Sequence, residues 1–170
     1  AKQSAALARL CGDADSLVLQ SFRNTLRFLL SVVEDQFEPT TDGVAFEDLM
    51  PLDKLMLARL VQVQAEVDDA YEAFEFNRAY RTLYDFVVTE LSNVYLDALK
   101  DRLYCEKDGS LERRSAQTVV AELLSMLMRD LQPILAYTVD EAMEFAPAGC
   151  RDNEEYAALL SWYQAPITLE

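Results

Sequence analysis

Residues 51–74 read PLDKLMLARLVQVQAEVDDAYEAF, and this stretch decides the fold class. Its apolar side chains recur every three or four residues, which is the period of one face of an α-helix. The proline at its start suits the first turn of a helix, where the missing N–H has no partner anyway. The apolar stripe consists of Met56, Leu60, Val63, Val67, Ala70, Tyr71 and Phe74. We therefore predict a long helix that begins at Pro51 and turns this stripe toward a core.

Segments before this stretch repeat the helical period. Apolar positions predict helices over 7–10 and 16–33, and Asp15 is placed to cap the second of them. Residues 37–48 contain Pro39, an Asp-Gly pair and two threonines, which is turn chemistry in a segment too short to link two domains. The chain should therefore reverse direction between the first helices and the long one.

Helical periods also continue after the long helix. Asn77 is placed to cap a helix that runs to about residue 104, and the polar residues 106–110 should form a turn. A further helix is predicted over 119–135, with a bend near its end at Pro133, because proline removes a backbone donor.

Two weaker helices complete the pattern. Thr138 can cap a short helix over 139–145, and residues 153–162 resemble a terminal helix. The expected fold is an all-α helical bundle of four to six helices. Residues 1–165 should form one domain, followed by a tail over 166–170.

Composition excludes several classes of protein. The 170 residues are 51% hydrophobic, yet they contain no run of about 18 apolar residues, so we expect neither disorder nor a membrane span. The absence of histidine removes Ser/His and Cys/His catalysis and metal sites that need histidine. Three separated cysteines without a Cys-x-x-Cys pair suggest a reducing, cytoplasmic setting. These absences exclude many kinds of enzyme chemistry.

The two ends of the chain suggest an excised fragment. The sequence starts at Ala1 without an initiator methionine, and it closes on Leu169-Glu170, which could be a vector-derived junction.

The formal net charge of -15 argues against indiscriminate binding to nucleic acid, but it is unevenly distributed. Residues 34–75 carry -10 and residues 119–170 carry -7, whereas 1–33 carry +2 and 76–118 are neutral. Eleven of the fifteen cations thus lie in two segments. These two segments are where an anionic partner would bind.

Both cationic segments admit two interpretations. Arg23 and Arg27 lie one helical turn apart, so they could grip successive phosphates or pair with acids of a neighbouring helix. Lys100 and Arg102 lie near the predicted end of a helix beside Tyr104, where they could stack on RNA bases or simply complement the helix dipole.

Four motifs in order resemble a known family. They are RNTLRFLL at 23–30, YLDALKDRLY at 95–104, RRSAQT at 113–118 and PILAYTVDE at 133–141. Together they closely resemble the anticodon-binding domain of isoleucyl-tRNA synthetase, a class I aminoacyl-tRNA synthetase, and the resemblance covers residues 1–165. It implies a helical bundle that follows the catalytic domain and receives the anticodon stem-loop of isoleucine tRNA.

The resemblance also implies what lies elsewhere in the parent enzyme. That enzyme uses ATP with magnesium to attach isoleucine to its tRNA, and a separate editing domain hydrolyses mischarged valine. The His-x-Gly-His and Lys-Met-Ser-Lys-Ser motifs of class I catalysis are missing from this sequence. The expected partners are therefore the tRNA and the catalytic and editing domains of the parent chain, with no cofactor bound by this fragment and no membrane.

Contact residues follow from the resemblance one by one. In related enzymes the helix matching 16–35 and the segment near 100–102 face the anticodon, which makes Arg23 and Arg102 the first candidates. Second candidates are Lys100, Asn24 and Arg27. We expect Arg23, Arg27, Lys100 and Arg102 to converge on one face.

Three candidates keep a structural alternative. Arg113 and Arg114 could hold a phosphate or pair with Glu112 and Asp101. The Asn24 amide could read a base edge or, buried between helices, satisfy backbone groups.

Some residues suit packing better than chemistry. Tyr80, Tyr84 and Tyr95 belong to a core stripe, with hydroxyls reaching its edge. Met126 and Met128 should fill gaps between helices. The acids between residues 66 and 75 should form a solvated face rather than a metal site, because their spacing scatters them around a helix.

Two other functions remain open. The acidic stretch 34–75 could make the chain a helical protein-interaction module for a basic partner. The chain could also be the anticodon domain of a valyl or leucyl relative.

Overall fold

The computed structural model describes residues 19–33, 37–152 and 154–167. Their regular elements are all helices, with no strand in these ranges, and this confirms the predicted all-α bundle. The described part of the first helix covers residues 19–33; the expected helix over 7–10 and the Asp15 cap lie outside the described residues. Two short elements follow, α2 (Pro39–Asp42) and η1 (Phe46–Asp48), in the region where a reversal of the chain was predicted.

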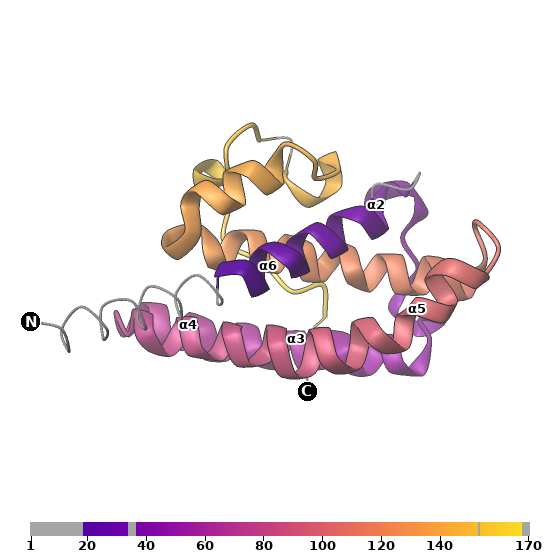
Figure 1. Cartoon of the computed structure of the whole chain (residues 1–170), viewed down its shortest axis with the longest axis horizontal. Coiled ribbons are helices and arrows are strands. Elements are labelled where there is room, and N and C mark those ends of the chain that lie inside the picture. The colour runs from indigo at the N-terminus through magenta and orange to yellow at the C-terminus, as the bar shows by residue number, and fades with distance from the viewer. Residues whose placement is uncertain (1–18, 34–36, 153, 168–170) are drawn as a thin grey trace, which may run out of the picture.

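Long helices form the body of the bundle. The predicted central helix is α3 (Pro51–Glu72), with its proline in the first turn. One helical run then comprises α4 (Phe76–Asp85), the π-helical segment η2 (Phe86–Tyr95) and α5 (Leu96–Cys105). Figure 1 shows this run lying along α3, with helix 19–33 and α6 (Leu111–Met143) packed on the other side.

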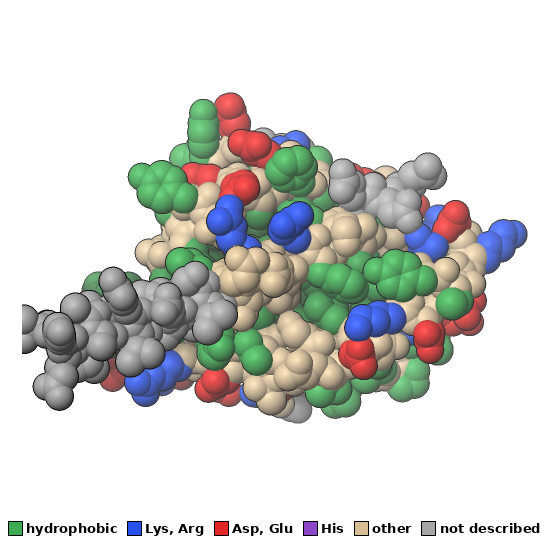
Figure 2. Space-filling view, in the orientation of Figure 1, with side chains coloured by type: hydrophobic (Ala, Val, Ile, Leu, Met, Phe, Trp, Pro, Cys, Tyr) green, Lys and Arg blue, Asp and Glu red, His purple; other side chains and the backbone are tan. Residues whose placement is uncertain are grey.

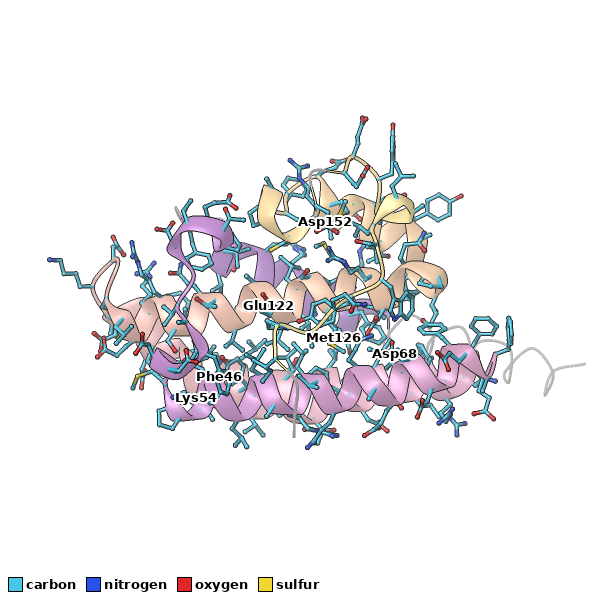
Figure 3. The ribbon with its side chains drawn as sticks, turned by 180° about the vertical axis from the view of Figure 1, so that it is seen from behind. Phe46, Lys54, Asp68, Glu122, Met126 and Asp152 are labelled. Carbon is cyan, nitrogen blue, oxygen red and sulfur yellow. The ribbon has the colours of Figure 1, made fainter. Side chains whose placement is uncertain are left out.

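The core lies between these layers. Leu60, Val63 and Val67 of α3 are fully buried, as the apolar stripe predicted. Met126 is also fully buried and lies between α6 and α3 (Figure 3), as expected of a gap-filling methionine. Close packing of this kind leaves little room for a change of side-chain volume. Ile167 still packs against this core, two residues beyond the predicted domain end at 165.

Helix boundaries differ from the prediction at several points. The helix after α3 starts at Phe76, with Glu75 as N-cap and no capping side chain, so Asn77 does not cap it. The π-helical turns of η2 were not predicted, because such turns are rare and occur inside longer α-helical runs. Within η2, Glu90 accepts two hydrogen bonds from Arg59 of α3, at 2.8 and 2.9 Å.

The end of α6 also corrects the prediction. A kink follows Pro133, where Leu135 has non-helical angles (φ -124°, ψ 43°), and a second helical stretch then runs to Met143. A separate helix after Pro133 is therefore present, but Thr138 lies inside it and does not cap it. The turn predicted over residues 106–110 is confirmed between α5 and α6. Gly109 in this turn has a φ of 75°, a backbone conformation that favours glycine.

The terminal helix predicted over 153–162 is wrong. Among the described residues 154–162, the only regular element is the short 3-10 helix η4 (Ala157–Leu159). A second short 3-10 helix, η3 (Ala148–Cys150), lies just before the predicted range. The buried guanidinium of Arg129 holds this segment by donating to Ser161 O at 3.0 Å and to Asp152 Oδ2 at 2.7 Å. Side chains of α6 thus take the place of the hydrogen bonds that a helix would have made.

Two aromatic residues have surroundings that the sequence did not indicate. Phe74, assigned to the core stripe, is 79% exposed and has a φ of 57°, because α3 ends at Glu72 and the chain turns there toward α4. The Tyr95 hydroxyl, expected at the edge of the core, is buried inside it.

Two free cysteines lead to a simple prediction. Cys105 is exposed, whereas Cys150 is buried, and burial raises the pKa of its thiol to about 12. We expect iodoacetamide at about pH 8 to alkylate Cys105 in the folded chain and Cys150 only after unfolding, because the thiolate is the reactive form. Mass spectrometry of the peptides measures both rates, and equal rates would contradict the buried position of Cys150.

Candidate nucleic-acid interface

Arg23 and Arg27 project from the exposed side of helix 19–33. The opposite side of the helix is buried through Phe22, Leu26 and Leu29, which fixes the orientation of both arginines. Arg23 donates a hydrogen bond to a carboxylate oxygen of Glu141 on α6. Arg27 forms no hydrogen bond or ion pair with the residues that the structure describes. One of the two guanidiniums is therefore free to take an anion.

Both arginines line a hollow of about 580 Å³ between helix 19–33 and the last turns of α6. Ten residues line it: Gln20, Arg23, Leu26, Arg27, Leu30, Ser31, Thr138, Glu141, Ala142 and Phe145. Two cations face one carboxylate, so the hollow is locally positive on a chain of net charge -15. The Phe145 ring is 58% exposed. Guanidinium groups beside an accessible ring can bind a phosphate and stack on a base.

Lys100 and Arg102 both lie on α5, but in different surroundings. Lys100 is exposed and bonds to Asp97 one turn earlier, with 2.7 Å between Nζ and Oδ1. This hydrogen bond raises the pKa of the Lys100 ammonium. Arg102 points inward, and only 17% of its side chain is exposed.

Arg102 is part of a buried polar network around Asp53. Its guanidinium makes two hydrogen bonds to the fully buried Asp53 carboxylate, at 2.7 and 2.9 Å. Tyr95 donates to the same carboxylate at 2.8 Å and Ser115 at 2.5 Å. The hydrogen bonds to Asp53 raise the pKa of Arg102, and burial raises the pKa of Tyr95 well above its ordinary range. The network joins α3, η2, α5 and α6 at one end of the bundle.

Arg113 and Arg114 pair with other acids than those expected. Arg113 pairs with Asp108 in the preceding turn, at 2.6 Å, and Arg114 pairs with Asp42 of α2 at 3.3 Å. Both arginines therefore help to hold the α5–α6 corner.

The Asn24 side chain is exposed on helix 19–33, beside Arg23 in sequence. Its Oδ1 accepts a hydrogen bond from Gln20 Nε2 at 2.8 Å. The alternative that it is buried and satisfies backbone groups between helices is thus wrong. Its amide N–H groups point to no partner among the described residues and remain available to a ligand.

The expected cations fall into two groups. Arg23 and Arg27 belong to helix 19–33 and share the hollow, whereas Lys100 and Arg102 belong to α5 and do not line it. Figure 2 shows Lys and Arg side chains over helix 19–33 and over the α5 end of the long helical run on one face, with hydrophobic side chains between them. The expected convergence of the four cations is therefore wrong: Arg23 and Arg27 share a hollow, Lys100 is exposed on α5, and Arg102 points inward to Asp53.

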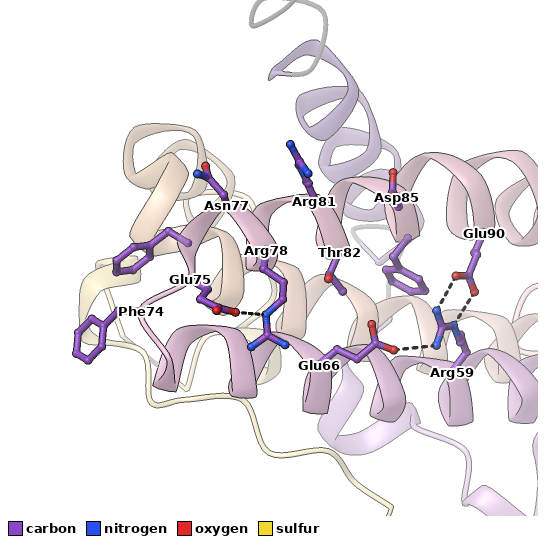
Figure 4. A pocket seen from close by; sticks show the side chains of 12 residues that line it. Arg59, Glu66, Phe74, Glu75, Asn77, Arg78, Arg81, Thr82, Asp85 and Glu90 are labelled. Atoms are coloured by element: carbon purple, nitrogen blue, oxygen red, sulfur yellow. Dashed lines mark hydrogen bonds and ion pairs between the residues drawn. The ribbon is translucent and has the colours of Figure 1, made fainter.

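A larger hollow of about 810 Å³ lies between α3 and α4 (Figure 4). Its three arginines face four carboxylates, and two of the arginines are engaged. Arg59 bonds to Glu90 and contacts Glu66 at 3.6 Å, and Arg78 pairs with Glu75 at 2.6 Å. This balance makes the larger hollow a poorer site for a polyanion than the smaller one.

Sequence reasoning missed three residues that shape these sites. Asp53 follows a first-turn proline and has the pattern of an ordinary acid at a helix start, so no local signal marks its burial. Glu141 was quoted only as part of a motif, and Phe145 only as the end of a predicted short helix. The one sign in the sequence was Pro133, because a bend there can turn the exposed side of the following residues, including Glu141, toward another helix.

No group of three or more His, Cys, Asp or Glu side chains in the described ranges could hold a metal ion. Among the helices described here, none is long and apolar enough to cross a membrane.

The fold and the smaller hollow define an all-α bundle with a locally cationic face. Residues 53–170 match the family described as the anticodon-binding domain of tRNA ligase, and the chain belongs to this family. This confirms the resemblance found in the sequence.

Curated relatives are similar over most of this chain. An isoleucine-tRNA ligase of Desulforudis audaxviator is 46% identical over 129 residues, which is 76% of this chain and 14% of the relative. One of Streptococcus thermophilus is 44% identical over 154 residues, which is 89% of this chain and 16% of the relative. One of Thermotoga neapolitana is 45% identical over 124 residues, 73% of this chain and 13% of the relative. The chain thus spans less than a fifth of the length of these relatives.

Proposed function

We propose that this chain binds the anticodon stem-loop of isoleucine tRNA. The observation that carries the proposal is the positive hollow of Arg23 and Arg27 on an acidic member of an anticodon-binding family. The names of the relatives support isoleucine rather than valine or leucine tRNA. In this proposal, the longer protein attaches isoleucine to the tRNA with ATP and magnesium, and its catalytic and editing domains are the intramolecular partners of this chain.

The cellular setting and the extent of the domain belong to the same proposal. Residues 1–165 form one anticodon-binding domain, and the protein works in the cytoplasm. The free thiols of Cys105 and Cys150 are consistent with a reducing compartment.

The candidate residues divide by role. Arg27 provides a guanidinium without a partner among the described residues, Arg23 provides a second guanidinium, now paired with Glu141, and Asn24 provides an amide beside them. Lys100 adds exposed charge on α5. Arg102 acts as a positioning residue, since its hydrogen bonds go to Asp53 and hold α5 in place.

The α5–α6 corner has an accessory role in this proposal. Arg113 and Arg114 hold the corner through Asp108 and Asp42, and either could exchange its partner for a phosphate. We expect alanine at Arg113 or Arg114 to weaken binding of the anticodon stem-loop less than alanine at Arg27 does, and the binding measurement described below for Arg27 tests this.

Removing Arg27 tests the proposal directly. We expect Arg27→Ala to weaken binding of the isoleucine tRNA anticodon stem-loop about 5-fold and to reduce the salt slope by about 0.7, because one phosphate contact is lost. Fluorescence anisotropy at several salt concentrations measures both quantities.

A matched control comes from the larger hollow. Arg81 is also exposed and has no hydrogen bond or ion pair in the described part of the chain, so Arg81→Ala removes the same charge elsewhere. Equal losses for the two variants would contradict a site at the smaller hollow. Valine and leucine tRNA stem-loops, measured beside the isoleucine one, test the choice of tRNA.

A further inference from the structure

The contact between Arg23 and Glu141 occupies the guanidinium that the proposed function needs. Arg23 lies on helix 19–33 and Glu141 on the part of α6 that follows the bend at Leu135. The two residues are 118 positions apart in the chain, and both line the smaller hollow. Glu141 is also the only acid among the residues that line this hollow in the described structure.

The ion pair is exposed and therefore exchangeable. The Arg23 side chain is 48% exposed and that of Glu141 59% exposed. Ion pairs in such positions contribute little to stability, because water solvates both groups when they separate. A ligand can displace the carboxylate without disturbing the buried side of either helix.

A carboxylate and a phosphate compete for the same donors. Both present oxygen acceptors that match the fork of a guanidinium, and both form charge-assisted hydrogen bonds with it. Arg27, one helical turn away, has no acid in contact within the described chain. An anion can therefore reach Arg27 at once, whereas at Arg23 it competes with Glu141 for the donors of the Nη2 group.

We propose that Glu141 is an internal competitor for RNA phosphate at Arg23, so that the hollow accepts a strand only when a phosphate displaces this carboxylate. The inference rests on the proposed function and deepens it. A strand with two phosphates at the spacing of the two arginines displaces Glu141, because the first contact at Arg27 raises the local concentration of the second phosphate. A single anion lacks this advantage. Glu141 thus lowers the affinity of Arg23 for any anion, and a strand already held at Arg27 overcomes this competition more readily than a free anion does.

Inorganic phosphate tests the competition without RNA. The ¹⁵N–¹H signal of the Arg23 Nε group is followed while phosphate is added to the chain, to Glu141→Gln and to Glu144→Gln. Glu144 is the matched control, since it is exposed at the end of α6 and its change removes the same charge without a contact to Arg23. We expect Glu141→Gln to bind phosphate at Arg23 about two- to five-fold more tightly, and Glu144→Gln to change it much less.

The anticodon stem-loop gives the second measurement. We expect Glu141→Gln to tighten its binding by a similar factor, and the gain to vanish in the Arg23→Ala background, because the competitor then has nothing to release. Equal effects of the glutamines at 141 and 144 would overturn the inference, since only net charge would then matter. Weaker binding by Glu141→Gln would overturn it as well.

The two measurements separate the inference from the proposed function. Tighter phosphate binding by Glu141→Gln, with no stem-loop bound by any variant, would support the competition at Arg23 and overturn the proposed function. Stem-loop binding that is lost with Arg27→Ala and unchanged by Glu141→Gln would support the proposed function and overturn the competition.

Discussion

Arg102→Ala is expected to lower the free energy of unfolding by about 3–5 kcal/mol, because it leaves a buried carboxylate without its charge partner. Asp53 is 0% exposed and both of its oxygens accept from Arg102. The remaining donors, Tyr95 and Ser115, are neutral and cannot balance a charge in the core. Urea denaturation followed by circular dichroism measures the loss.

Two further variants make this expectation specific. Lys100→Ala removes an exposed ion pair on the same helix and should change stability by less than about 1 kcal/mol. Replacing both partners, Asp53→Asn with Arg102→Met, should restore a large part of the stability, because no buried charge then remains. A loss below about 1 kcal/mol for Arg102→Ala would show that the network contributes little.

The expected loss changes how an Arg102 variant is interpreted. Weaker RNA binding by Arg102→Ala would follow from displacement of α5 as well as from a lost contact. Arg27 and Lys100 are exposed, so their alanine variants report on RNA contacts without this effect. Binding by Arg102→Ala should therefore be measured only under conditions in which the variant is shown to be folded.

Asp130→Asn is expected to stabilise the chain at pH 8 by on the order of 2–3 kcal/mol and to have little effect near pH 4. Burial raises the pKa of the Asp130 carboxyl to about 7, and Asp68 raises it further, while Gln64 and Arg129 oppose the shift. Asp130 Oδ2 has no hydrogen-bond partner. The charged form is therefore disfavoured in the folded state.

The sign of the pH dependence follows from proton binding. Between about pH 4 and pH 7 the folded chain keeps the Asp130 proton, whereas the unfolded chain has lost it. The contribution of this group to stability is thus fully present below pH 4 and is lost as the pH rises through 7. An asparagine at position 130 does not titrate in this range. Its N–H groups are also donors close to the side chain of Gln64, whose Oε1 lacks a hydrogen-bond partner among the described residues.

Thermal unfolding across this pH range tests the Asp130 prediction. Asp69→Asn is the control, because Asp69 is exposed on α3 and its change removes the same charge. The difference in stability between Asp130→Asn and the parent chain should grow as the pH rises from 4 to 8. A constant difference would contradict the raised pKa of Asp130.

Local patterns predicted the helices well and their ends less well. The long period of 51–72 identified α3, and the motifs identified the family, because both depend on residues close together in sequence. Phe74 continued the apolar period, yet it is exposed because the chain leaves the helix just before it. The segment after Cys150 has helical spacing, but Arg129 and other α6 side chains hold it as irregular chain.

The sequence by itself thus determined the all-α class, the central helices, the absence of histidine chemistry and the resemblance to anticodon-binding domains. Only the tertiary structure decided which cations are engaged. Arg23 meets Glu141 and Arg102 meets Asp53 across separations of 118 and 49 residues, and these partners differ in burial as well as in position. Periodicity reflects burial along one helix, whereas an ion pair requires two helices to place their side chains within a few ångströms of each other.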